Sequence, residues 1–376
     1  MHILIAPNAF KNSLTAYDAA QAIQKGIKLS ILRCTTTCFP IADGGDGTAG
    51  LIIQQLKGTI VPVAVHDPLG KLISTSFGLI ENGRTAVIEM ADASGLRLLN
   101  ANELNPLSAN SFGTGELIKA ALDTGVNKII IAMGGSATVD GGTGILKALG
   151  IGFLDTHDAE LVGIPASLPD LARVDISGLD KRLLACEIVV LCDVDNMLLG
   201  SRGAAVVFGP QKGADASTVG KLEQGLSKFA EITFKETGKD IASIKYGGTA
   251  GGASAGLYAY LNAKLVNGID YFMELTGFND ALNRSTLVIT GEGSIDEQTL
   301  QGKGPFGVAN SAKLKGIPVI GLAGKIPLEP HEQLNRYFDV LLAIGNEPSD
   351  MPTALSRTEQ NLIRVSKEIA EMLGMG

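Results

Sequence analysis

Short apolar runs alternate with amphipathic stretches at both ends of this 376-residue chain. Residues 2–6 (HILIA) form an apolar run that Pro7 stops, and a stretch with alanines and isoleucines on one face follows. Three further apolar runs, LVITG, PVIGLAG and FDVLLAIG, begin after Thr286, and a periodic helical stretch over about 353–373 comes last. Runs that are apolar on both faces predict parallel strands that helices cover.

The middle of the chain has a different pattern. The stretch GKLISTSFGLIENGRTAVIEMA predicts two antiparallel strands, because the Asn82-Gly83 pair is a strong hairpin signal. Helices and strands then alternate, with strands expected at 128–133 and 187–192. We therefore predict an α/β fold in which both chain ends, 1–65 plus 285–376, build one parallel-sheet domain. Residues 66–284 form a second, inserted α/β domain.

Composition narrows the class of protein. The net charge of −8 argues against nucleic acid as a partner, and the absence of Trp leaves few aromatic platforms for stacked bases. No run reaches the ~18 apolar residues of a membrane helix, and the first apolar run is too short for a signal peptide. The four cysteines form no CxxC pair. We expect a cytoplasmic protein with reduced thiols and no membrane partner.

Five polar, glycine-rich segments carry the candidate chemistry, and four of them directly follow a predicted strand. Ligands of doubly wound sheets bind at such places, where loops meet helix N-termini. The first segment, Pro7–Ser13, brings Lys11 to the start of a helix, where an ammonium group and the helix dipole can share an anion. A solvent-exposed lysine beside a Ser13 N-cap is the structural alternative.

The second segment, Ala42–Thr48 (ADGGDGT), places Asp43 and Asp46 on a glycine-rich turn. Its GxGxxG spacing does not indicate a dinucleotide site, because two acids repel a pyrophosphate unless a metal lies between them. Acids on such a turn suit Mg²⁺ or a sugar-like hydroxyl. A tight turn with an aspartate N-cap is the alternative.

The third segment, Gly134–Gly142 (GGSATVDGG), joins an apolar strand to the next helix. Successive small residues let backbone N–H groups converge on an anion, and hydroxyls add donors. The candidates are Gly134, Gly135, Ser136 and Thr138. A closely packed loop that needs small residues is the alternative.

The fourth segment spans residues 192–213. Asp193 and Asp195 lie two residues apart after a strand, as a metal pair or a base with its orienting partner requires. Arg202 suits bidentate binding of a carboxylate, and Lys212 can balance phosphate charge. Ion pairing within the loop is the alternative.

The fifth segment, 290–303, places Glu292 and Asp296 after a strand and ends on Lys303. N-capping of a helix by Asp296 is the alternative. The chain has neither the GxxxxGK[ST] motif of P-loop enzymes nor a GxSxG elbow. Phosphoryl transfer does not depend on either loop, since it needs positioned cations, a hydroxyl acceptor and a nearby carboxylate.

In this order, the five segments resemble those of the bacterial class I glycerate kinases, also called glycerate 2-kinases. The matching stretches cover essentially the whole chain: APNAFKNSLTA, ADGGDGT, GGSATVDGGTG, CDVDNMLLGSRGA with FGPQKGA, and LVITGEGSIDEQT with GKGPFGVA. The resemblance implies ATP with Mg²⁺, D-glycerate as acceptor and 2-phosphoglycerate as product. It also implies a flavodoxin/Rossmann-like domain with a second α/β domain inserted.

The sequence departs from the family pattern at Asn12, Asp46, Val139, Phe112 and Ser294, and the last two departures are the more serious. Phe112 and Ser294 stand where many members carry Arg. If either arginine binds phosphate or carboxylate, this protein uses another cation of the five segments instead. A kinase for a different small hydroxy-acid or polyol therefore stays open as the alternative substrate class.

Within this resemblance we hypothesise a role for each candidate residue. Asp193 orients or deprotonates the acceptor hydroxyl, while Lys11 and Arg202 bind the substrate carboxylate. The candidate Mg²⁺ ligands are Asp195, Asp43 and Asp46. The candidate ATP-binding residues are Gly134, Gly135, Ser136, Thr138, Lys212, Glu292, Asp296 and Lys303. The expected partner is the small-molecule substrate, and a homodimer stays open.

Two other classes of function compete with this interpretation. A nicotinamide-dependent oxidoreductase would use the glycines at 45–50 and an acid at a strand end about 20 residues later, but the nearest acid, Asp67, sits in a DPLG turn. A protein that keeps the fold without catalysis would bind nucleotide without turnover. The acids retained in the motifs argue against this second alternative.

Overall fold

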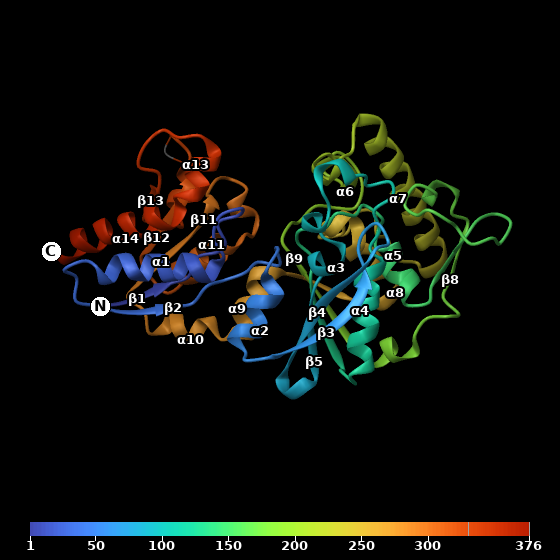
Figure 1. Cartoon of the computed structure of the whole chain (residues 1–376), viewed down its shortest axis with the longest axis horizontal. Coiled ribbons are helices and arrows are strands. Elements are labelled where there is room, and N and C mark those ends of the chain that lie inside the picture. Colours follow the sequence, from blue (N-terminus) through green and yellow to red (C-terminus); the bar gives the residue numbers. More distant parts are fainter. Residues whose placement is uncertain (330, 376) are drawn as a thin grey trace. The chain divides into compact units, whose positions relative to one another are not determined.

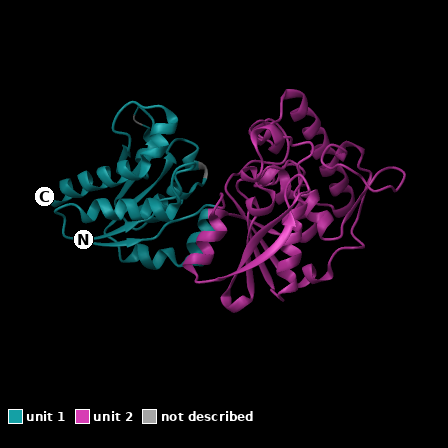
Figure 2. Cartoon of the chain, in the orientation of Figure 1, with its two compact units in different colours: residues 1–43, 269–376 teal, residues 44–268 magenta. Residues whose placement is uncertain are grey.

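The structure is a computed structural model that describes residues 1–329 and 331–375. The chain forms two compact units, one made of residues 1–43 with 269–376 and the other of residues 44–268 (Figure 1, Figure 2). The first unit is therefore built from both chain ends, and the second is inserted between them.

The first unit contains a parallel sheet of five strands in the order β13-β12-β11-β1-β2. Numbered along the chain, this order reads 2-1-3-4-5, which is the flavodoxin-like order. The predicted fold class of this unit is confirmed. Its strands are β1 (His2–Ile5), β2 (Thr35–Cys38), β11 (Leu287–Ser294), β12 (Val319–Lys325) and β13 (Val340–Ala343).

Helices cover this sheet. On one side α1 (Ala16–Lys28) and α14 (Thr358–Gly374) lie side by side (Figure 1), and a Cβ at Gly26 would stand 2.3 Å from the carbonyl oxygen of Ile363. The single predicted helix over 353–373 is two helices, because Arg357 (φ −99°, ψ 3°) leaves the helical conformation. The other helices are α9 (Gly268–Thr276), α10 (Phe278–Asn283), α11 (Gly304–Lys313), α12 (Glu332–Asn335) and α13 (Met351–Ser356).

The second unit contains a mixed sheet in the order β10-β9-β6-β5-β4-β3, in which β4 alone runs against its neighbours. The predicted hairpin is confirmed between β4 and β5, where Asn82 and Gly83 take positive φ angles. A separate pair, β7 and β8, is antiparallel. The strands are β3 (Thr59–His66), β4 (Leu72–Ile80), β5 (Thr85–Glu89), β6 (Lys128–Ala132), β7 (Gly152–Leu154), β8 (Arg173–Asp175), β9 (Glu187–Cys192) and β10 (Lys264–Asn267).

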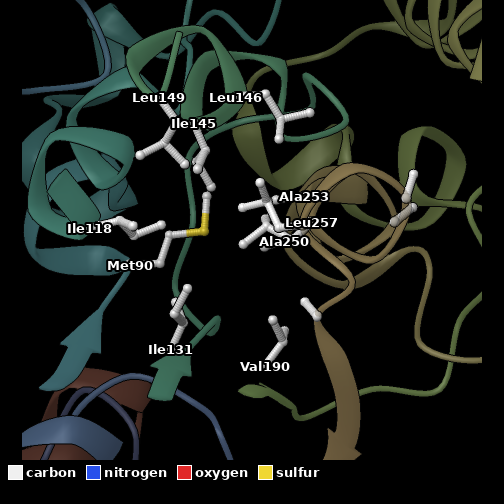
Figure 3. Close-up of a cluster of buried hydrophobic side chains, with 14 of the residues drawn as sticks. Met90, Ile118, Ile131, Ile145, Leu146, Leu149, Val190, Ala250, Ala253 and Leu257 are labelled. Atoms are coloured by element: carbon white, nitrogen blue, oxygen red, sulfur yellow. The ribbon is translucent and has the colours of Figure 1, made fainter. Parts of the chain in front are cut away.

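A continuous apolar core holds the helices of the second unit against this sheet. Side chains from β6, β9, α4, α5 and α8 converge in Figure 3, where Met90 and Ile131 lie among leucines, isoleucines and alanines. The helices are α2 (Thr48–Gln55), α3 (Ala91–Ser94), α4 (Phe112–Asp123), α5 (Thr143–Ala148), α6 (Ala204–Phe208), α7 (Ala216–Thr237) and α8 (Ala253–Leu261).

The division into units falls at different residues from the predicted boundaries at 65/66 and 284/285. Residues 44–65 lie in the second unit, because β3 pairs with β4 along its whole length. Residues 269–284 lie in the first unit, where Phe278 packs edge-to-face on Phe39 with ring centroids 5.3 Å apart. The apolar pattern alone does not say which sheet a segment joins.

Two general expectations concern the whole chain. Among the residues that the structure describes, no helix is both long and apolar enough to cross a membrane. The four cysteines, Cys34, Cys38, Cys186 and Cys192, are free thiols.

Removal of side-chain volume from the core in Figure 3 should destabilise the second unit. Ile131 is fully buried, so Ile131→Ala removes apolar contacts and leaves a cavity. We expect a loss of about 2–5 kcal/mol in the free energy of unfolding. Leu184→Ala, at a leucine that is 79% exposed, is the control and should change stability by under about 0.5 kcal/mol. Equal urea midpoints for the two variants would contradict the assignment of Ile131 to a packed core.

Candidate active site

The adjacent strands β1 and β11 form the topological switch point of the flavodoxin-like sheet. Ligands of such sheets bind beyond the carboxyl ends of the strands at this point. Asn8 and Lys11 follow β1, and Glu292 lies near the end of β11. The backbone N–H of Asn8 donates to the carbonyl of Gly291 (2.8 Å), which joins the two loops. The first unit therefore gathers candidate residues where its fold predicts a ligand.

Asp43 connects two loops of this switch point. Its Oδ2 accepts hydrogen bonds from Asn8 Nδ2 (2.9 Å) and from the backbone N–H of Gly304 (3.2 Å), the first residue of α11. A carboxylate at a helix N-terminus is stabilised by the helix dipole. The aspartate thus caps α11, and α2, the helix that follows it in sequence, begins after Gly47 with no side-chain cap.

Glu292 is a buried acid, 8% exposed, at the same place. Its Oε1 accepts a hydrogen bond from Thr299 Oγ1 (3.1 Å). Burial and the neighbouring Asp43 raise its pKa to about 7, although Lys303 and Lys11 oppose the shift. A carboxyl group that exchanges its proton near neutral pH suits proton transfer or ligand binding.

The other candidates of the first unit have simpler surroundings. Asp296 accepts hydrogen bonds from the backbone N–H of Gln298 (2.9 Å) and from Ser294 Oγ (3.2 Å), so it stabilises its own turn. It is not the helix N-cap that the alternative proposes, because the N-cap of the following short helix is Gln298. Lys11 is exposed in the turn after β1. Lys303 is the N-cap residue of α11.

In the second unit, two glycine-rich loops lie against each other at the carboxyl end of β6. The N–H of Gly134 donates to the carbonyl of Gly44 (2.9 Å), and a Cβ at Gly134 would stand 2.4 Å from Cα of Gly45. A Cβ at Gly135 would stand 3.3 Å from Cβ of Asp46. The backbone contact therefore needs glycine and places Asp46 beside the GGSATVDGG loop.

Several backbone N–H groups of this loop already have protein acceptors. Those of Gly134, Ala137, Gly141 and Gly142 all donate within the second unit. One side chain of this loop, that of Thr138, is fully buried, and its Oγ1 has no hydrogen-bond partner among the residues that the structure describes. A hydroxyl without a partner is costly in a buried position, so Thr138 is the group of this loop that best fits a ligand.

Lys212 holds the same loop from the other side. Its side chain is 2% exposed, and Nζ donates to Ser136 Oγ (3.0 Å) and to the carbonyl of Thr138 (2.7 Å). Burial lowers its pKa to about 7, against the opposing charges of Asp140 and Asp193. An anion bound nearby would favour the charged ammonium form.

Asp140, the acid of the GGSATVDGG motif, has a structural role. Its carboxylate accepts hydrogen bonds from the backbone and hydroxyl of Ser111 (2.8 and 2.7 Å). It also accepts from the backbone N–H groups of Gly142 (3.0 Å) and Gly144 (3.2 Å) at the start of α5. This fully buried carboxylate fixes the end of the loop.

Asp193 and Asp195 follow β9 in the second unit. Asp193 is half-buried and close enough to Lys212 to act on its pKa. Asp195 Oδ1 pairs with Arg202 Nη2 at 3.2 Å, and the Arg202 side chain is 63% exposed. The loop ion pair that the sequence left open is therefore present, and it joins a candidate metal ligand to a candidate carboxylate-binding group.

Two charged residues of the second unit were not predicted. Arg97 pairs with Asp46 (2.8 Å from Nη1 to Oδ1) and with Asp92. Glu89, which ends β5, is 4% exposed, and its Oε2 accepts a hydrogen bond from the backbone N–H of Ala49 in the first turn of α2 (2.8 Å). Burial raises the pKa of Glu89 well above its usual value. The one sequence feature that could have indicated Glu89 is an acid at the end of an otherwise apolar strand.

Both units contain carboxylates of the type that binds a divalent metal ion. Among residues 1–329 and 331–375, no three or more His, Cys, Asp or Glu side chains are grouped so as to hold a metal ion by themselves. Mg²⁺ does not require such a group, because it usually keeps several waters and binds one or two carboxylates together with substrate phosphates. Asp43 in the first unit, and Asp46 and Asp195 in the second, are side chains of the type that such coordination uses.

Comparisons with known proteins identify the family. The model of the glycerate kinase family matches residues 3–374. The glycerate kinase of Bacillus subtilis (strain 168) is 43% identical over 98% of this chain and 97% of its own length. The glycerate 2-kinase of Escherichia coli (strain K12) is 42% identical over 100% of this chain and 99% of its own.

A solved structure agrees with these relatives. The crystal structure of a protein provisionally named glycerate kinase 2, from Salmonella typhimurium LT2, superposes with a TM-score of 0.84 at 41% identity. It covers 100% of this chain and 99% of that one. An α/β kinase is the class of enzyme that these findings define. The chain belongs to the glycerate kinase family.

The raised pKa of Glu292 predicts a pH-dependent stability. Between its ordinary value of 4.5 and about 7, the folded protein holds a proton on this residue and the unfolded chain does not. Unfolding then releases a proton, so the contribution of Glu292 to stability falls as pH rises through this window. Glu292→Gln should gain roughly 1–3 kcal/mol relative to the wild type between pH 4.5 and 7.5.

Urea unfolding of both proteins across this pH range measures the effect. Glu274→Gln, at an exposed glutamate of the same unit, is the matched control and should follow the wild type. If the stability of Glu292→Gln also runs parallel to the wild type, Glu292 is ionised throughout and its burial does not control its proton.

Proposed function

We propose that the protein transfers the γ-phosphoryl group of ATP to D-glycerate and gives 2-phosphoglycerate and ADP. The observation that carries the proposal is the full-length similarity to the E. coli relative, whose name specifies the 2-kinase. The acids and lysines at the carboxyl ends of the strands supply the groups that such a transfer needs. The free thiols agree with a cytoplasmic setting.

In this proposal Asp193 acts on the acceptor hydroxyl. The hydroxyl oxygen forms a bond to the γ-phosphorus, the bond from that phosphorus to the ADP oxygen breaks, and Asp193 receives the hydroxyl proton. Lys11 and Arg202 bind the carboxylate of the acid. Because Arg202 is paired with Asp195, its guanidinium must either break this ion pair or bind Asp195 and the substrate carboxylate together.

The residues of both units fit a nucleotide with Mg²⁺. The unpartnered hydroxyl of Thr138 and the ammonium of Lys212 support phosphate binding next to Gly134, Gly135 and Ser136. In the first unit we assign nucleotide binding to Glu292, Asp296 and Lys303. When bound, Mg²⁺ neutralises charge on the phosphate oxygens. We assign Asp43, Asp46 and Asp195 as the ligands of Mg²⁺. Each of them has a hydrogen-bond or ion-pair partner in the structure, which the ion would replace.

Another small hydroxy-acid or polyol is the second candidate acceptor. Neither Phe112 nor Ser294 supplies a cation, and Ser294 Oγ donates to Asp296 within its own turn. An acceptor site that lacks these two charges fits a less acidic substrate as well.

A coupled assay tests the proposed reaction. Purified protein with ATP, Mg²⁺ and D-glycerate should give a product that enolase consumes without added phosphoglycerate mutase, because enolase acts on 2-phosphoglycerate. A signal that requires the mutase identifies the 3-phosphate and contradicts the regiochemistry. ATP turnover that is independent of glycerate, but is stimulated by another hydroxy-acid or a polyol, selects the second candidate.

Substitution of the proposed base tests the mechanism. Asp193→Asn keeps the size of the side chain and removes its ability to accept a proton, so kcat should fall by roughly 10²–10⁴-fold. Asp123→Asn, at a surface aspartate that pairs with Arg182, is the control and should retain the wild-type kcat. A kcat for Asp193→Asn within a few-fold of wild type removes this residue from the role of base.

A further inference from the structure

The second unit contains a pocket of about 440 Å³ that the candidate residues above do not line. Its walls come from the end of β3, the start of α4, the start of α5 and the loop after β7. The lining is mainly apolar, and the apolar side chains are Leu107, Phe112, Leu161 and Ile164. Pockets of this size and character hold small organic ligands.

This pocket adjoins the GGSATVDGG loop. Ser111, which precedes Phe112, donates both its N–H and its hydroxyl to Asp140 of that loop. A Cβ at Gly144, a pocket residue, would stand 2.6 Å from the backbone nitrogen of Phe112. Neighbours in sequence of the residues that hold the proposed phosphate loop in place, Phe112 and Gly144 among them, therefore build one wall of the pocket.

The aromatic wall is held in position. Phe112 and His66 meet edge-to-face with ring centroids 6.1 Å apart. His66 Nδ1 lies 2.9 Å from Glu116 Oε1, and the backbone N–H of His66 donates to Glu116 Oε2 (2.7 Å). The N–H of Phe112 donates to Asn110 Oδ1 (3.0 Å). A wall fixed in this way binds a flat ligand with little loss of side-chain freedom.

The charges around the pocket do not favour a small anion as its ligand. Its two basic residues are compensated, His66 by Glu116 and Lys147 by Glu160, each at 2.9 Å. A small hydroxy-acid would leave the apolar walls exposed and would find no uncompensated cation among them. A flat heterocycle covers the same walls and stacks on an aromatic ring.

We propose that this pocket binds the purine base of the nucleoside triphosphate, with the base stacked on Phe112. Its phosphates then extend toward the GGSATVDGG loop, where Thr138 and Lys212 lie. This assignment rests on the proposed function only for the identity of the nucleotide. It gives Phe112 a task in nucleotide binding that a contact with the acid substrate does not require.

The absence of tryptophan from the chain allows a direct test. Phe112→Trp introduces one indole, whose fluorescence a stacked purine quenches. ATP and adenosine should both quench this emission saturably, and inorganic tripolyphosphate, which lacks the base, should not. Phe234→Trp, at a phenylalanine that is 58% exposed on α7, is the matched control and should not respond to adenosine.

Either of two results overturns the assignment. One is unchanged emission of Phe112→Trp at adenosine and ATP concentrations well above the KM for ATP, or up to millimolar levels if ATP is not turned over. The other is equal quenching by tripolyphosphate and by ATP, which reports a phosphate or a change of conformation and not a base.

A second variant keeps the proposal testable if Phe112→Trp does not fold. Phe112→Leu keeps an apolar side chain and loses the ring, so it should weaken ATP binding in equilibrium dialysis on the order of 5- to 100-fold. An unchanged Kd for ATP overturns the proposal even if glycerate is phosphorylated. A weakened Kd supports it even if glycerate proves to be the wrong acceptor.

Discussion

The close contact between the backbones at Gly134 and Gly45 is the constraint on which the candidate site of the second unit depends. No side chain fits between these two segments, so the loop after β6 and the loop before α2 have one mutual position. That position sets Asp46 beside Gly135, within reach of Arg97. In the middle of the loop, Lys212 donates hydrogen bonds to Ser136 and Thr138. Backbone packing therefore orients the polar groups before any ligand arrives, which is the condition for electrostatic catalysis.

Each unit buries one ionisable side chain whose pKa is brought to about 7. In the first unit this is the carboxyl group of Glu292, and in the second it is the ammonium group of Lys212. Burial drives both shifts, and neighbouring charges oppose or reinforce it. Groups of this kind cost the protein stability and gather at functional sites, where a ligand of suitable charge recovers the cost. Each of the two residues therefore marks a candidate functional position within its own unit.

The sequence predicted the strands of the first unit and the β4–β5 hairpin, because apolar runs and an Asn-Gly turn determine these elements locally. The compact units divide the chain at residues other than the predicted boundaries, since the apolar pattern of β3 is the same whichever sheet it joins. The sequence also missed the break at Arg357. It missed the ion pair of Arg97 with Asp46 because the two residues are distant in the sequence. The candidate segments were recognisable by composition. The sequence did not show which backbone N–H groups of these segments already donate within the protein, because the acceptors lie on other segments.

The central strand of the first sheet has a consequence for synthesis of the chain. β1 precedes the inserted unit in the sequence, but one of its two neighbours, β11, begins at Leu287, after that unit. All of residues 44–268 must therefore emerge before β1 can pair on that side, and these residues hold all the strands of their own sheet. Domains generally fold as units during translation. The inserted unit is accordingly in a position to fold first, and the N-terminal strand waits with an open edge that chaperones or a neighbouring nascent chain can occupy.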